Sequence, residues 1–116
     1  MINRSAVILR YKAPAVAWIN TADPHQEDPG ITMQSVNQER TVYLISEGDG
    51  EDDASVAAWI EDNFRALFES EIHGWYLDES LWPELTGLKM FREWFDVESH
   101  SMIVDTVDAA LEDDEL

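Results

Sequence analysis

The chain contains no cysteine in its 116 residues. A disulfide framework, a thiolate metal site and a cysteine nucleophile are therefore excluded, and the fold must be stabilised by packing. The chain also lacks a long apolar run, and no stretch approaches the roughly 18 consecutive apolar residues that indicate a membrane span. The apolar part of residues 1–15 is too short and too soon followed by charge for a signal peptide. We therefore expect no membrane partner and a cytoplasmic location.

Basic residues are scarce, with 7 Lys and Arg against 25 Asp and Glu and a net charge of −18. The imbalance begins after Arg40, because residues 1–40 hold four acids and four bases, whereas the remainder holds 21 acids and three bases. A field of this sign repels nucleic acid and anionic membranes and attracts basic proteins. We expect a basic protein partner and no nucleic-acid partner. The alternative is that the acidity only keeps a small protein soluble.

Length and apolar content predict a single globular domain. Hydrophobic residues make up 45% of the chain, and five Trp, three Tyr and four Phe supply large side chains for a core. A chain of this length buries roughly two thirds of its unfolded surface when it folds. We place the domain at residues 1–107 and an acidic, mobile tail at residues 108–116.

Strands and helices are expected to alternate along the chain. The strands are predicted from branched aliphatic or continuous apolar runs at residues 5–12, 40–46 and 100–107. The helices are predicted at residues 13–22, 32–39, 54–73 and 88–95. Helices between strands favour crossover connections. The sequence therefore predicts an α/β fold with a small three-stranded, mostly parallel sheet covered by three to four helices, or an α+β fold if one strand runs antiparallel.

A candidate polar site follows from the expected parallel sheet. Asp105 interrupts an apolar run near the end of the last predicted strand, and a buried carboxylate needs a partner or a shifted pKa. In a parallel sheet the same edge would carry Arg10 and Lys12, and ligands bind at such edges. His100, earlier in that strand, lies within reach of Glu98. Asp105, His100, Lys12 and Arg10 are therefore candidates for either a structural ion-pair cluster or a functional site.

Signatures of catalysis and metal binding are missing. The chain has no glycine-flanked nucleophile elbow and no phosphate-binding glycine loop. Residues 47–55 begin like a calcium loop, but Ala54 replaces the required glycine. The three histidines are scattered, which does not suit zinc. We predict no cofactor and no bound metal, and keep as an alternative a small metal-dependent or hydrolytic enzyme that uses His100 and Asp105, alone or together with His73.

An aromatic segment follows the longest predicted helix and contains Trp75, Tyr76 and Trp82 together with Asp78 and Glu79. Large aromatic side chains often anchor interfaces, so these five residues are the candidate partner-binding surface. The opposing interpretation is that the aromatic rings cover the core where the helix ends. A further alternative is a homodimer with no separate ligand, in which the aromatic residues form the contact between copies.

Two blocks of sequence, GWYLDESLWP (residues 74–83) and FREWFDVESHSM (residues 91–102), resemble those of a family of small acidic bacterial proteins. The resemblance extends over most of the chain after Arg40 and more loosely to APAVAWIN. It implies a bacterial, cytoplasmic protein, but it implies no activity and no site residue. Our hypothesis from the sequence is a non-enzymatic binding, adaptor or inhibitor module for a basic protein.

Overall fold

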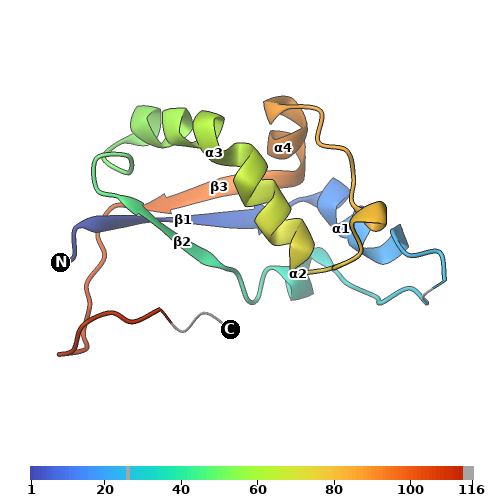
Figure 1. Cartoon of the computed structure of the whole chain (residues 1–116), viewed down its shortest axis with the longest axis horizontal. Helices are drawn as coiled ribbons and strands as arrows, with labels where there is room; N and C mark the ends of the chain where they lie inside the picture. The colour runs from blue at the N-terminus through green and yellow to red at the C-terminus, as the bar shows by residue number, and fades with distance from the viewer. Residues whose placement is uncertain (26, 114–116) are drawn as a thin grey trace.

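A three-stranded antiparallel sheet forms the centre of the computed structural model, which describes residues 1–25 and 27–113 (Figure 1). The central strand is β1 (Arg4–Tyr11), flanked by β2 (Val42–Ser46) and β3 (Phe95–His100) in the order β2-β1-β3. Both outer strands run antiparallel to β1, so that Val7 lies opposite Tyr43 on one side and Ser99 on the other.

The prediction of a mostly parallel sheet is wrong, and the protein has an α+β fold. β1 and β2 are joined through α1 (Ala13–Thr21) and α2 (Met33–Val36), which are short. A nine-residue helix spans about 13 Å, whereas an eight-residue strand spans about 26 Å. Neither helix can carry the chain back along the full length of β1, and the chain instead re-enters the sheet near the end at which it left.

The crossover expected from the alternation of strands and helices does occur, but between strands that are not neighbours. β2 and β3 point in the same direction, since each is antiparallel to β1. They are linked through α3 (Asp53–His73), the short 3-10 turn η1 (Glu79–Leu81) and α4 (Leu88–Trp94). At 21 residues α3 spans about 31 Å, which is enough to return the chain along the sheet.

Helix positions agree well with the sequence pattern. The Thr32 hydroxyl caps α2 by accepting a hydrogen bond from the Ser35 backbone N–H, as expected. The Asp52 carboxylate accepts from the Ser55 backbone N–H at the start of α3, and this bond lowers the pKa of Asp52. Gly74 follows the last residue of α3, which confirms the predicted end of that helix.

The helix side of the sheet holds the core. In Figure 1, α3 and α4 lie on the same side of the three strands. The inward side chains of β1 include Val7 and Leu9, which are 0% and 1% exposed. Phe91 of α4 is completely buried, with its ring 6.0 Å from that of Phe64 and 5.6 Å from that of Phe95. The stripe that α3 contributes consists of Val56, Ile60, Leu67, Phe68 and Ile72.

The opposite side of the sheet, called the open face below, carries the alternate residues of the same strands. On β2, Val42 and Leu44 are 54% and 48% exposed. The register places Val42 opposite Ile8 and Leu44 opposite Ala6. The remaining side chains of the open face are Arg4 and Arg10 of β1, Ser46 of β2, and Asp96, Glu98 and His100 of β3.

The last strand lies earlier in the chain than predicted. β3 ends at His100, and residues 101–113, called the arm below, form no helix or strand. The backbone N–H of Ile2 donates to the Ile103 carbonyl at 2.8 Å, which ties the start of the arm to the end of the sheet. Residues 114–116 of the predicted acidic tail lie outside the described residues.

Candidate functional site

Most of the aromatic segment is engaged in packing and hydrogen bonding. The Tyr76 hydroxyl donates to the Ile19 carbonyl at 2.6 Å, and the Trp82 indole N–H donates to the Tyr76 carbonyl at 2.7 Å. Asp78 accepts hydrogen bonds from the backbone and hydroxyl of Ser80 at the start of η1, and these bonds lower its pKa. Tyr76 and Trp82 thus cover the core beyond the end of α3.

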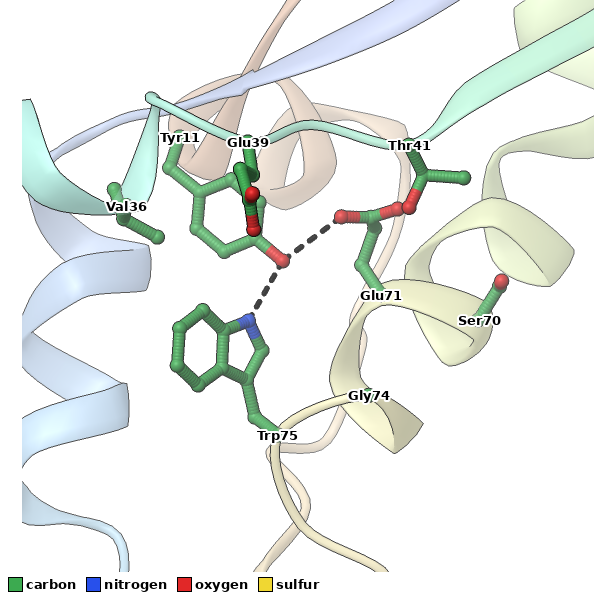
Figure 2. A pocket seen from close by; sticks show the side chains of 8 residues that line it. All are labelled: Tyr11, Val36, Glu39, Thr41, Ser70, Glu71, Gly74 and Trp75. Atoms are coloured by element: carbon green, nitrogen blue, oxygen red, sulfur yellow. Dashed lines mark hydrogen bonds between the residues drawn. The ribbon is translucent and has the colours of Figure 1, made fainter.

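Trp75 is placed differently and contributes to a polar network under a pocket (Figure 2). Its indole N–H donates to the Tyr11 hydroxyl at 2.8 Å, and that hydroxyl donates to Glu71 Oε1 at 2.8 Å. The second oxygen of Glu71 accepts a hydrogen bond from the Tyr43 hydroxyl. The network joins β1, β2, the last turn of α3 and the residue just beyond Gly74.

The two tyrosines act as hydrogen-bond donors to Glu71. Burial, followed by the negative charge of Glu71, raises the pKa of Tyr11 far above the usual value. Burial, followed by the hydrogen bond to Glu71, likewise raises the pKa of Tyr43. Both hydroxyls therefore keep their protons at neutral pH and hold the carboxylate in place. Such groups suit recognition better than acid–base catalysis, which needs a pKa near the working pH.

The pocket above this network has a volume of about 200 Å³. A water molecule takes about 30 Å³ of liquid volume, so the pocket has room for part of a long side chain. Its chemistry is set by two carboxylates, two aromatic rings and three hydroxyl groups. The lining residues are Tyr11, Val36, Glu39, Thr41, Ser70, Glu71, Gly74 and Trp75. Within residues 1–25 and 27–113, neither Glu39 nor Glu71 forms an ion pair.

Sequence analysis identified Trp75 but missed Tyr11, Glu39 and Glu71. A signal was present for Glu71, which lies three residues after Phe68 and four after Leu67, on the apolar stripe of α3. A carboxylate on such a stripe needs hydrogen-bond donors, and the two tyrosines supply them. No comparable signal marks Glu39, which is exposed and precedes β2.

The four residues of the candidate polar site do not come together in the structure. The antiparallel register places Arg10 opposite Asp96, and Lys12 Nζ lies 3.8 Å from Asp96 Oδ1. His100 lies toward the other end of the sheet, opposite Ala6. Asp105 belongs to the arm, where its Oδ1 accepts a hydrogen bond from the backbone N–H of Val107 at 2.9 Å. The cause is the direction of the strands, since only a parallel sheet would bring their carboxyl ends to one edge.

The expected contact between Glu98 and His100 is confirmed, with Glu98 Oε2 and His100 Nε2 separated by 3.0 Å. Arg40 Nη1 approaches the other oxygen of Glu98 at 3.3 Å. The hydrogen bond to His100, followed by that to Arg40, lowers the pKa of Glu98. This cluster lies on the exposed surface of the sheet and adjoins no cavity described above.

The residues proposed for the enzyme alternative are far from forming one centre. His73 ends α3 on the helix side, with its ring 6.1 Å from that of Trp82, whereas His100 lies on the open face. No group of three or more His, Asp or Glu side chains in the described part of the chain could hold a metal ion. In the calcium-like segment, Asp49 accepts from the Ser46 hydroxyl at 2.6 Å.

Comparison with known proteins adds no family assignment. No protein-family model, curated protein or solved structure matches this chain. None of the helices within residues 1–25 and 27–113 is long and apolar enough to cross a membrane. The fold and the pocket geometry therefore carry the functional argument.

Proposed function

We propose that this protein is a non-enzymatic binding module for a basic protein, and that the pocket beside Glu71 receives a lysine or arginine side chain of that partner. The observation that carries this proposal is an unpaired carboxylate, fixed by two tyrosine donors, beneath a cavity walled by Trp75 and bordered by Glu39. An ammonium or guanidinium group inserted there would pair with Glu71 and lie close to aromatic rings, which attract cations.

The wider surface supports the same partner chemistry. Acidic residues of the turn before α3 and of the outer face of that helix are exposed. They include Glu47, Glu51, Glu61, Asp62 and Glu69. The ion pairs found in the described residues involve only Asp96 and Glu98, on the other side of the sheet. The charge on the helix side is therefore free to attract a basic surface and to speed its approach.

The same electrostatics disfavours nucleic acid as a partner, because the helix side presents carboxylates where phosphates would have to approach. We keep a cytoplasmic location as part of the proposal. An adaptor and an inhibitor would both use this pocket, and the chemistry of the bound side chain is common to them.

The proposal is tested by titrating the protein with a lysine-rich synthetic peptide and measuring affinity by calorimetry. Glu71→Gln keeps the size of the side chain and removes its charge, and we expect the affinity to fall about tenfold, or about 1.4 kcal/mol. Glu69→Gln is the matched control, since it removes one exposed charge from the same helix outside the pocket. We expect it to change affinity by less than about threefold, as for other exposed charges.

Two results would count against the proposal. Equal losses in the two variants would show that overall charge, and not the pocket, binds the peptide. Binding that does not weaken as salt rises would show that electrostatic attraction is not the main contribution.

A further inference from the structure

Two apolar side chains of β2, Val42 and Leu44, form a small patch on the open face that the described chain covers only in part. Val42 lies opposite Ile8 and Leu44 opposite Ala6, and the small Ala6 is itself buried, at 3% exposed. Val42 and Leu44 are about half exposed, at 54% and 48%. An exposed patch of this kind on an otherwise polar surface indicates a contact surface.

The open face also differs in charge from the rest of the molecule. Arg4 and Arg10 lie on it, and Arg40 reaches it by pairing with Glu98. Three of the seven Lys and Arg residues of the chain thus lie here against two acids, Asp96 and Glu98, on a protein with a net charge of −18. The patch is therefore suited to a partner that is both apolar and acidic.

The arm has that composition. Its Met102, Val104, Val107 and Leu111 are 65% to 76% exposed, and the chain holds no Lys or Arg after Arg92. Six of the ten large apolar side chains exposed in the described residues belong to the arm or to β2 of the open face. The radius of gyration of 15.7 Å exceeds the roughly 13 Å of a compact chain of this length, as a protruding arm requires.

We propose that the occupant of the open face is a second copy of this chain, whose arm packs on Val42 and Leu44, while the arm of the first copy packs on the second in return. Figure 1 shows the arm leaving the end of β3 on the side of the sheet away from α3 and α4. Within one copy, the arm leaves Val42 and Leu44 about half exposed. The start of the arm is held at the end of the sheet by the hydrogen bond between Ile2 and Ile103. A two-fold exchange covers the apolar side chains of the arm and of the open face in both copies, and it leaves no such surface free to bind a third copy.

Salt distinguishes this association from the binding of a basic partner. Two copies with a charge of −18 repel each other, and the repulsion is screened beyond about 8 Å at physiological ionic strength. Dimerisation therefore tightens as salt rises, because the repulsion between two whole copies involves many more charges than the attraction of the arm's acids to Arg4 and Arg10, and apolar contacts hold the dimer. The binding of a lysine-rich peptide weakens under the same change, so the two proposals fail independently.

The test is sedimentation velocity of the full chain over a range of concentrations and at low and high salt. We expect a monomer–dimer equilibrium, with the dimer favoured by salt. Leu44→Asp on the open face and Val107→Asp in the arm should each return the monomer. Leu77→Asp is the matched control, since Leu77 is 77% exposed and lies outside both surfaces, and it should leave the dimer unchanged.

Engineered cysteines identify which arm occupies the face, and the cysteine-free chain suits this experiment. Leu44→Cys and Val107→Cys are placed in separately tagged copies, which are mixed and oxidised. A disulfide that links two differently tagged copies supports the exchange. A monomer at all concentrations, a dimer that survives both aspartate variants, or a disulfide that forms only within a chain carrying both cysteines would overturn the proposal.

Discussion

The helix side and the open face are built from alternate residues of the same three strands, yet they differ in packing and in charge. On the helix side, Val7 and Leu9 are buried under α3, and the outer surface of that helix is acidic. On the open face, Arg4 and Arg10 lie toward the two ends of β1, and Leu44 of β2 is half exposed. Our two proposals build on this difference, since they assign a cationic partner to one side of the sheet and an acidic, apolar one to the other.

The largest expected effect tests whether the two sides differ in their contribution to stability. Phe91→Ala removes a completely buried ring on the helix side and should lower the free energy of unfolding by about 3 to 5 kcal/mol. Val42→Ala on the open face should change it by less than about 0.5 kcal/mol. Urea denaturation at protein concentrations too low for association measures both. Comparable losses would mean that the open face is part of the core.

A smaller effect is expected where the helix side meets the turn between β2 and α3. A Cβ atom on Gly50 would lie 2.1 Å from the Cβ of Ser5, which is 1% exposed. Gly50→Ala should therefore destabilise the fold by about 1 to 3 kcal/mol, since the backbone must move. Gly48→Ala in the same turn is the control, because no atom lies within 4 Å of the added methyl group. If both variants unfold at the same urea concentration, the turn does not pack on β1 as described.

The smallest effect concerns the Glu98 cluster on the open face. The pKa of Glu98 is lowered in the folded protein, so its interactions with His100 and Arg40 stabilise the fold above the usual glutamate pKa of about 4.3. This contribution is lost as the pH falls through the lower, folded-state pKa. The stability difference between the wild type and Glu98→Gln should therefore be present near neutral pH and vanish in acid. A difference that is unchanged by pH would rule out this electrostatic contribution, which exposure keeps small.

Local structure could be predicted well from the sequence. The apolar stripe and Gly74 located α3, Thr32 located α2, and branched aliphatics located β1. These signals act over a few residues, so they need no knowledge of the rest of the fold. The candidate residue Trp75 was found because a large aromatic side chain outside a helix is conspicuous.

Strand direction and the last strand could not be predicted in the same way. Residues 102–107 attracted the strand prediction because they are apolar, whereas β3 alternates between inward Phe95 and Val97 and outward Asp96 and Glu98. That alternation is the period of a half-buried strand and was the better signal. The pocket was missed for a related reason, since Tyr11 and Glu71 are 60 residues apart and meet only through the tertiary fold.

The most direct test of the central claim is an NMR titration of the isotopically labelled protein with the lysine-rich peptide, following the indole N–H signals of the five Trp side chains. Because the Trp75 indole N–H donates to Tyr11 under the pocket, its signal should shift most, together with the backbone signals of Ser70 and Glu71. Shifts confined to the arm and the open face, with the Trp75 signal unmoved, would contradict the account.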